Sequence, residues 1–483
     1  MPVDTERSDV TAMRPKWSRL RDCFSGRDAV LNAGSKYVPD LKGLDIAGNT
    51  AYRQRGNFYN AVKRTVQGLT GVIFQKAPEV KMPEPLKSFL DDVTSTNVTF
   101  EMFSFDAGQE AMLMGRMGVL IDMAAIEAPT NRPYLCSYLA ESIINWRTVP
   151  YGGEDILTLL ILREVTDETD EKDSFVNKRI EQYRECRMLG GIYSQQLWRE
   201  SDIRGRKEWV PYGAPIIPTR RGDPLTFIPF VFIGSQHATT ELDEPPLTDL
   251  ADTCLAHWRN SVDHEYGLHL TALPTPWVSG AKGPQDGSPL PIGPSKVWEL
   301  ELQGQAGMLE FTGAGLKALA EAMAEKKKQM AVIGARMLED VPNVDETATA
   351  VRLRRSGENA SLRTVANAME QAFTMILQTV VWWQTSVDHP RDAIAEVGLN
   401  KEYANVRITA PEVQAALQAV KEGKMSFETW WNLLTTGGWG REGVDATAEK
   451  KEIDKDIPEP APAPIPDPVL KPGEPGYVPP VAA

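Results

Sequence analysis

Two neighbouring segments, 315–340 and 347–386, limit most strongly what this chain can fold into. Both repeat apolar residues at steps of three, four and seven, the pattern of an apolar stripe along an α-helix. The first stripe comprises Leu316, Leu319, Met323, Met330, Ile333 and Met337. The second comprises Leu362, Val365, Met369, Phe373, Ile376, Val380 and Trp383. We therefore predict two consecutive long helices.

The second helix is unusually long. From Glu346 to Thr385 the chain contains no proline and one glycine, Gly357. At about 1.5 Å per residue, a continuous helix of this length spans about 60 Å, far more than an average globular helix. A rod of this length is typical of a mechanical element in an assembly, so we interpret the chain as a structural protein.

A short acidic link, 341–346, separates the two predicted helices. Pro342 ends the first helix, because proline cannot continue it. Asn343 offers an N-cap for the second helix, with Glu346 as its capping-box partner. The acidic residues around this break are Glu339, Asp340, Asp345 and Glu346.

Length and composition indicate a folded protein with several subdomains. The chain has 483 residues, 42% of them hydrophobic, and a net charge of −14. This charge disfavours a surface that grips nucleic acid, but it allows an acidic wall along which nucleic acid slides. The four cysteines have no metal-binding spacing and indicate reduced thiols. Without a signal peptide or a membrane-spanning segment, we expect an intracellularly made, soluble protein.

Before the helical pair, the pattern indicates an N-terminal arm and then an α/β region. Residues 1–45 show weak periodicity, so we expect an arm that is at most partly ordered. Helices are predicted near 59–71 and over 100–114, followed by a buried strand at 118–122. Residues 131–235 indicate strands. Among them Gly190-Gly191 marks a hairpin. The charged run 166–173 indicates a loop between strands, and Pro229 indicates that its strand lies at a sheet edge.

The segment 315–340 is also the second helix of a predicted helix–insert–helix arm, whose first helix and insert come before it in the chain. Pro245-Pro246 opens a helix that Pro274 ends. Residues 276–314 contain two short strand candidates, Lys296–Leu302 and Met308–Phe311, and form the tip of the arm. After residue 385 we expect small helices, one capped by Ser426. Residues 456–483 are crowded with proline and indicate a disordered tail.

Candidate chemistry is sparse. His264, Glu265 and His269 resemble a zinc-protease motif, but histidines at i and i+5 lie about 140° apart on a helix and cannot share a metal as an i, i+4 pair does. The run Lys326, Lys327 and Lys328 spreads over about 200° of helix. These lysines could meet phosphate, although a solvated face or a subunit salt bridge is the stronger interpretation. We expect no enzyme, no cofactor and no metal.

Six strings, taken in order, resemble the portal (head–tail connector) proteins of tailed bacteriophages. They are VIFQKAP at 72–78, GRMGVLID at 115–122, PPLTDLA at 245–251, HLTALPTP at 269–276, IGARMLE at 333–339 and ETATA at 346–350. The resemblance covers about residues 50–445 and implies the α+β portal fold. Its implied parts are an N-terminal arm (1–45), an α/β wing that is sheet-rich from 117 (46–240), stem helix 1 (241–275), a small β-containing clip (276–314), stem helix 2 (315–340), a tunnel-loop link (341–346), a long spine helix (347–386), a small helical crown (387–455) and the tail (456–483).

The resemblance also implies a function. Portal proteins form rings, typically dodecamers, at one capsid vertex of the virion, where they contact the major capsid protein. Double-stranded DNA passes through the ring during DNA packaging and DNA ejection, and terminase and then a tail adaptor dock on it. The tunnel-link residues facing DNA would be Glu339, Asp340, Pro342, Asn343, Asp345 and Glu346. Two alternatives stay open: another ring-forming head–tail adaptor, and a metal-dependent hydrolase using the histidine motif above.

Overall fold

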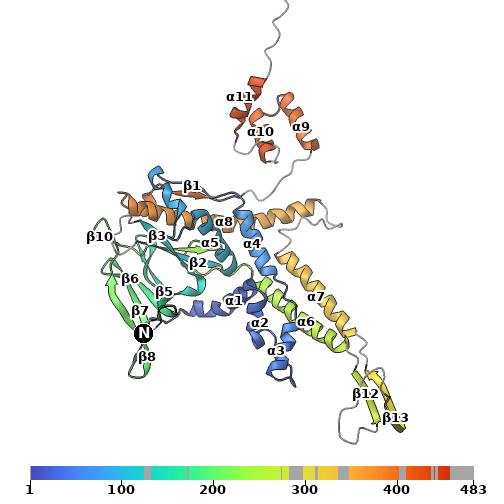
Figure 1. Cartoon of the computed structure of the whole chain (residues 1–483). Coiled ribbons are helices and arrows are strands. Elements are labelled where there is room, and N and C mark those ends of the chain that lie inside the picture. Colours follow the sequence, from blue (N-terminus) through green and yellow to red (C-terminus); the bar gives the residue numbers. More distant parts are fainter. Residues whose placement is uncertain are drawn as a thin grey trace, which may run out of the picture. The chain divides into compact units, whose positions relative to one another are not determined.

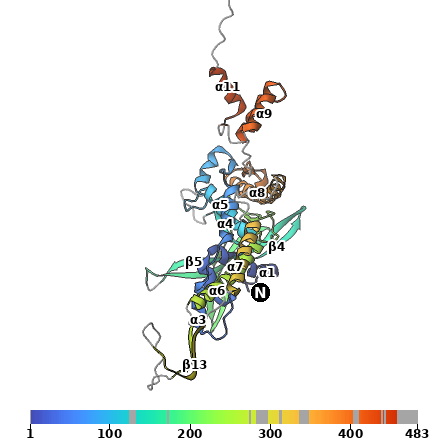
Figure 2. The ribbon, with the colours of Figure 1, turned by 90° about the vertical axis from the view of Figure 1, so that its right-hand side faces the viewer.

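The chain folds into helices and antiparallel sheets in two compact units, Met1–Lys401 and Glu402–Ala483. The computed structural model describes residues 2–123, 132–170, 173–272, 275–281, 297–309, 314–334, 348–401, 410–436, 440 and 444–456. Figures 1 and 2 show its ribbon in two perpendicular views.

A three-stranded sheet with the order β11-β2-β3 contains the most deeply buried strand of the first unit. Its strands are β2 (Arg116–Met123), β3 (Pro133–Leu139) and β11 (Phe230–Gly234). In register, Val119 of β2 stands opposite Val231 on one side and Ser137 on the other. The predicted buried strand at 118–122 is thus confirmed. The edge position that Pro229 predicted for the following strand is also confirmed.

A five-stranded meander forms the second sheet. Its strands are β4 (Ile143–Tyr151), β5 (Glu154–Thr169), β6 (Asn177–Leu189), β7 (Ile192–Ile203) and β8 (Arg206–Ile216), in that order. Gly190 and Gly191 have φ angles of 60° and 82° and form the predicted hairpin turn. The loop predicted at 166–173 begins too early, because β5 stays paired with β6 as far as Thr169. Charged side chains are compatible with a strand whose face meets solvent.

Three helices pack together next to the three-stranded sheet. They are α4 (Ala61–Ile73), α5 (Phe100–Met114) and α8 (Ala348–Gln384). Helices α5 and α8 contact the sheet, and α4 packs against both of them. The predicted helix over 100–114 is confirmed, and Gly115 ends it in a left-handed conformation. The 37 residues of α8 confirm the long second helix, and all seven residues of its predicted stripe are buried. Phe373 of this stripe lies edge-on to Phe100 of α5, with ring centroids 5.9 Å apart.

The N-terminal segment is ordered, contrary to the predicted arm. It forms α1 (Ser8–Ser25), α2 (Arg27–Asn32), η1 (Gly34–Lys36) and α3 (Ile46–Arg55). Trp17 and Leu20 of α1 are fully buried, and the Trp17 indole donates a hydrogen bond to the carbonyl of Met114 at 3.0 Å. Burial of this apolar face stabilises the segment. The proline inside α1, Pro15, weakens the helical signal in the sequence.

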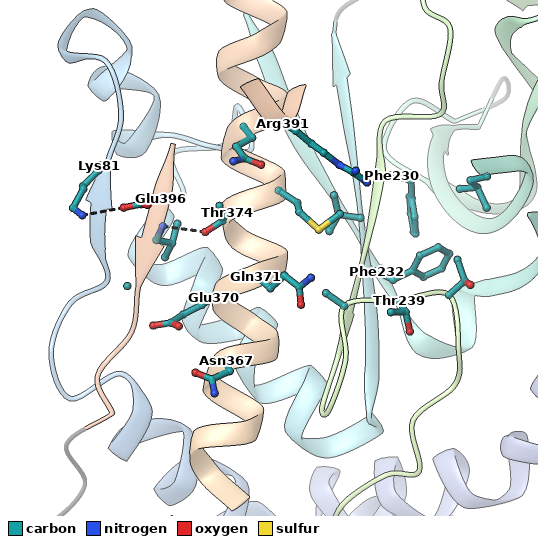
Figure 3. A pocket seen from close by; sticks show the side chains of 18 of the residues that line it. Lys81, Phe230, Phe232, Thr239, Asn367, Glu370, Gln371, Thr374, Arg391 and Glu396 are labelled. Carbon is teal, nitrogen blue, oxygen red and sulfur yellow. Dashed lines mark hydrogen bonds and ion pairs between the residues drawn. The ribbon is translucent and has the colours of Figure 1, made fainter. Parts of the chain in front are cut away.

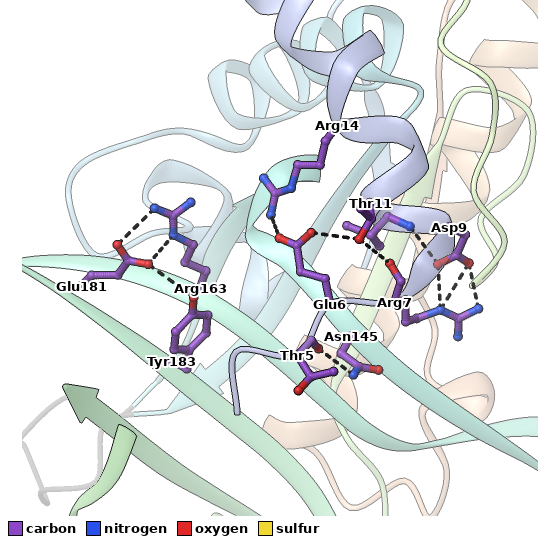
Figure 4. A network of polar contacts seen from close by, with 11 residues as sticks. Thr5, Glu6, Arg7, Asp9, Thr11, Arg14, Asn145, Arg163, Glu181 and Tyr183 are labelled. Atoms are coloured by element: carbon purple, nitrogen blue, oxygen red, sulfur yellow. Dashed lines mark hydrogen bonds and ion pairs between the residues drawn. The ribbon is translucent and has the colours of Figure 1, made fainter. Parts of the chain in front are cut away.

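The residues before α1 are fastened to the meander by polar contacts (Figure 4). The Asn145 amide donates to the carbonyl of Thr5 at 2.9 Å, and the Arg7 guanidinium donates to the carbonyl of Trp146 at 3.1 Å. The Arg7 guanidinium also lies over the Trp146 ring, 4.1 Å from its centroid. Residues 2–7 therefore belong to the packed body of the first unit.

Short elements complete the first unit. They are β1 (Glu79–Lys81), η2 (Glu84–Asp91), η3 (Ala140–Ser142), β9 (Thr219–Arg220), β10 (Asp223–Pro224), η5 (Pro390–Asp392) and β14 (Glu396–Gly398). Strand β14 pairs with β1, with Val80 opposite Val397. The expected helical crown over 387–455 therefore begins too early, because residues 387–401 belong to the first unit.

The second unit contains three small helices. They are α9 (Ala410–Lys421), α10 (Phe427–Thr436) and α11 (Ala446–Asp456). Trp431, Leu434 and Ala446 form its buried core. The Ser426 hydroxyl accepts a hydrogen bond from the backbone N–H of Thr429 at 3.1 Å, which confirms the predicted cap. The predicted disordered tail lies outside the described residues from 457 onward.

Candidate functional site

The arm consists of two paired helices and a hairpin between them. The helices are α6 (Thr248–Ala272) and α7 (Ala314–Ile333), and the hairpin strands are β12 (Thr275–Ala281) and β13 (Leu300–Leu309). The arm confirms the predicted order of helix, β-containing insert and helix. The two short strand candidates of the insert are corrected: each overlaps only part of β13, and β12 was not predicted. Strand β12 begins directly after Pro274, the predicted end of the helix, and contains Pro276.

The two arm helices are antiparallel and approach each other closely (Figure 1). Near one end the thiol of Cys254 lies 3.3 Å from the sulfur of Met330. Near the other end, a Cβ added to Gly267 would lie 2.5 Å from Leu316. The glycine thus allows a close crossing, and the sulfur pair fills the space nearest to the body. Met330 is fully buried.

Helix α4 closes over the end of the arm nearest to the body. A Cβ added to Gly334 would meet Thr65 of α4 at 2.6 Å and Leu250 of α6 at 2.8 Å. Trp258 of α6 is buried, and its ring lies 6.0 Å from that of Phe58, which precedes α4. The arm therefore grows out of the hydrophobic core that α1, α4 and α6 share.

The arm exposes apolar side chains both beside this core and toward the hairpin. Ile333 belongs to the stripe predicted for the first long helix, yet it is 40% exposed, so the stripe is not fully covered within one chain. The other exposed apolar residues of the arm include Leu268, Leu270, Trp277, Met308 and Val332. Apolar side chains that gather on one part of a surface mark a site of contact with another molecule.

The structure brings two of the three predicted lysines to one place. Lys326 is half-buried, whereas Lys327 and Lys328 are exposed. Burial of the His257 ring, together with the positive charges of Lys327 and Lys326, lowers the pKa of His257 to about 4. The Lys327 ammonium lies 5.6 Å from the centre of the Tyr59 ring. Lys326 and Lys327 thus share surroundings with His257 that Lys328 does not share.

The histidine motif on α6 brings two of its three residues near each other. The Nδ1 atom of His264 lies 3.6 Å from a carboxylate oxygen of Glu265, which is beyond hydrogen-bonding distance. Within the described part of the chain, no group of three His, Cys, Asp or Glu residues is arranged to hold a metal ion. All four cysteines are unpaired.

The expected tunnel-link residues lie outside the described residues. They are Glu339, Asp340, Pro342, Asn343, Asp345 and Glu346. Among the helices that the structure describes, none is both long enough and apolar enough to cross a bilayer.

A cavity of about 1000 Å³ lies between α8, β11 and the β1–β14 pair (Figure 3). Several polar groups of its wall fix β14 to α8. The Thr374 hydroxyl accepts a hydrogen bond from the Val397 N–H at 3.1 Å, and the Glu370 carboxylate accepts one from the Leu399 N–H at 2.6 Å. Lys81 and Glu396 pair across the small sheet at 2.9 Å. These contacts give the polar wall a structural role.

A partly buried ion pair within the five-stranded sheet is linked to the three-stranded sheet by a tyrosine. The Arg184 guanidinium of β6 donates to the Glu164 carboxylate of β5 at 2.6 Å, and the Tyr138 hydroxyl of β3 donates to the same carboxylate at 2.6 Å. Burial alone would raise the pKa of Glu164, but the Arg184 charge and these hydrogen bonds outweigh burial and lower it. The pair and Tyr138 link the sheets in the charged state.

Comparison with known proteins adds weak similarities. Residues 246–384, which contain the arm and α8, match a family described as a domain of unknown function (DUF4055). The search of curated proteins found no match.

Three solved chains, all from gene transfer agent (GTA) particles, align over most of this chain. A chain of the virion of the native particle aligns at 12% identity with a TM-score of 0.38, over 82% of this chain and 94% of its own. A neck chain of the empty particle, computed with C6 symmetry, aligns at 11% identity with a TM-score of 0.36, over 80% of this chain and 92% of its own. A neck chain of the native particle, computed with C12 symmetry, aligns at 13% identity with a TM-score of 0.36, over 78% of this chain and 89% of its own. Scores this low assign neither a fold nor a function.

One part of the site was missed from the sequence. The surroundings of His257 combine Tyr59, Arg64, Lys326 and Lys327, which are far apart in the chain. The available signal was the antiparallel pairing of two helices of similar length, which brings the middle of one opposite the middle of the other. Tyr59, before α4, and Arg64, within α4, reach the surroundings of His257 only through tertiary packing. The hydrophobic pattern of the sequence does not predict this contact.

Proposed function

We propose that this chain is the subunit of a portal ring, a structural protein of a phage-like particle. The observation that carries the proposal is the arm followed by the 37-residue helix α8. This order of elements is the one that the resemblance to portal proteins implies for stem, clip and spine. The α/β body before the arm takes the place of the wing.

Ring formation is supported by the uncovered apolar surface of the arm. Val332 is 59% exposed and Met308 is 57% exposed, although both lie in regular elements. Burying such side chains against a second copy contributes about 25 cal/mol per Å² of apolar surface removed from water. In a closed ring every copy contacts its neighbours through the same surfaces, so that no apolar interface remains exposed to solvent.

In this role, double-stranded DNA passes through the ring, and terminase and a tail adaptor bind at the β12–β13 end. The net charge of −14 per chain suits a channel wall, because a mainly acidic surface makes few phosphate contacts and lets DNA slide. The proposed function is mechanical and requires no catalytic residue. The subunit would act in the virion, at the vertex where head and tail join.

Native mass spectrometry of the purified full chain at several concentrations tests the proposal. We expect one closed oligomer, typically of twelve copies, whose mass stays constant as the concentration rises. A matched variant, Val332→Asp, introduces charge into the exposed apolar surface of the arm and should shift the population toward monomers without unfolding them. A wild-type protein that stays monomeric at high concentration with a folded arm would contradict the proposal.

A further inference from the structure

A cluster of positive charges surrounds one tyrosine where the arm meets α4. The Arg64 guanidinium lies 5.4 Å from the centre of the Tyr59 ring, and the Lys327 ammonium lies 5.6 Å from it. The His257 ring is tilted against the same tyrosine, with centroids 6.1 Å apart. Lys326 is close enough to lower the pKa of His257. We call these five residues the cation cluster.

Among the residues that the structure describes, the charges of the cation cluster are not neutralised. In the part of the chain that the structure describes, no carboxylate forms an ion pair with Arg64, Lys326 or Lys327. This is unusual for a protein with a net charge of −14, in which acidic residues outnumber basic ones. Three cations kept together without a counter-charge repel one another, so an anion bound among them would be stabilised.

His257 provides a second, independent sign of a missing anion. Its side chain is 2% exposed, and both ring nitrogens lack a hydrogen-bond partner among the described residues. A buried polar group without a partner costs about 1–3 kcal/mol. A negative group bound among these cations would satisfy an imidazole N–H and would offset the repulsion from both lysines.

We propose that the cation cluster binds a backbone phosphate of double-stranded DNA. The inference rests on the proposed function, which brings DNA to this protein. Arg64 and Lys327 are exposed, which leaves the cluster open to a phosphate that is part of a long polymer. Arginine and lysine are the side chains that most often hold phosphates. Phosphate contacts carry no sequence information, so the site positions DNA without reading it.

The first test measures binding of a short DNA duplex to the full chain by fluorescence anisotropy at several salt concentrations. We expect the double substitution Lys326→Gln/Lys327→Gln to weaken binding equally for all sequences. The affinity lost between about 50 and 200 mM salt should be about tenfold smaller in this variant, because two phosphate contacts are removed. Lys328→Gln, one residue further along the same helix, removes one positive charge outside the cluster and should keep the wild-type salt dependence.

The second test locates the contact by acetylation of lysines, read by mass spectrometry. DNA should protect Lys326 and Lys327 but leave Lys328 reactive. Equal salt dependence in the double variant and the wild type, or equal protection of all three lysines, would overturn the site. Protection by inorganic phosphate at the same phosphate concentration would assign the cluster to a small anion and would overturn the assignment to DNA.

Native mass spectrometry of the same samples separates this inference from the proposed function. A double variant that forms rings but binds DNA like the wild type would remove the site and leave the ring standing. A double variant that loses the ring while an unassembled fraction keeps wild-type DNA binding would show that the cluster contacts a second copy. That result would also overturn the assignment to DNA.

Discussion

At the scale of single residues, Gly118 shows how tightly the three-stranded sheet is packed. A Cβ added to Gly118 would overlap the ring of Phe230 and approach Ile143 to 2.8 Å. We expect Gly118→Ala to lower the free energy of unfolding by about 1–3 kcal/mol, since a packed core does not accept an added methyl group. Gly71 in α4 is the matched control, because nothing lies within 4 Å of its added Cβ. Gly71→Ala should raise stability by about 0.5–1 kcal/mol.

Urea unfolding of both glycine variants, followed by circular dichroism, measures these two changes. The expected signs are opposite, so a general effect of the added methyl group cannot produce the result. Equal stability of Gly118→Ala and the wild type would mean that the sheet is looser at β2 than the structure indicates.

The partly buried ion pair between Arg184 and Glu164 predicts a dependence on pH. We expect Arg184→Met to cost about 1–3 kcal/mol at neutral pH, because it leaves the partly buried Glu164 carboxylate without its counter-charge. Since the pKa of Glu164 is lowered below its ordinary value of 4.5 in the folded state, its charged form stabilises the fold above that pH. This stability is lost as the pH falls through the folded pKa. The difference between wild type and variant should therefore shrink in acid.

Urea midpoints at several pH values give the measurement. Arg163→Met is the control, because Arg163 pairs with Glu181 at 2.8 Å in a largely solvated setting and such pairs contribute less than about 1 kcal/mol. A stability difference for Arg184→Met that is constant from neutral to acidic pH would show that the charge on Glu164 has no part in it.

At the scale of elements, long periodic helices were predictable from the sequence, whereas long-range packing was not. The stripe of α8 identified a helix whose seven striped residues are buried, and the bounds predicted for α5, 100–114, agree with the structure. The N-terminal helix was not predicted, although Met13, Trp17 and Leu20 recur at helical steps. Pro15 interrupts this pattern, and the stability of the helix comes from packing on α4 and α6. Strand β12 escaped notice because its pairing partner lies about thirty residues away.

The arm yields a prediction about a single element. Met330 is fully buried against Cys254, where α6 and α7 meet the body. Met330→Ala removes this packing and should cost about 2–5 kcal/mol. We expect backbone amides of α6 and α7 to exchange hydrogen faster, measured by mass spectrometry, while those of the two sheets stay protected. Lys328→Ala, an exposed change on the same helix, should leave exchange unaltered. Faster exchange spread evenly over the whole first unit would contradict a separately anchored arm.

At the scale of the whole molecule, the order of the main elements and the net charge could be predicted from the sequence, but the cation cluster could not. The alternation of body, arm and long helix follows from helical periodicity and from proline positions. The cation cluster combines Tyr59, His257 and Lys327 from three separate segments, and no local pattern links them. The spread of the lysine run around its helix was correctly anticipated, yet only the paired arm helices decide which two lysines converge.

Charge reversal at the predicted link tests the channel. We expect Glu339→Lys/Asp340→Lys to leave ring assembly unchanged but to slow DNA packaging, because positive charge beside passing phosphates favours retention. Added salt should partly restore the packaging rate. Glu208→Lys, an exposed acidic residue of β8, is the control and should package normally. Wild-type packaging by the link variant at every ionic strength would mean that the link does not line a channel.

The most direct measurement of the central claim is electron cryomicroscopy of the assembled full chain, at a resolution that traces helices. We predict a closed ring in which α6 and α7 of every copy surround a central channel wide enough for double-stranded DNA. The β12–β13 hairpins should form one rim of that ring. An open filament, or a ring in which the arms point away from the axis, would contradict the assignment of this chain as a portal subunit.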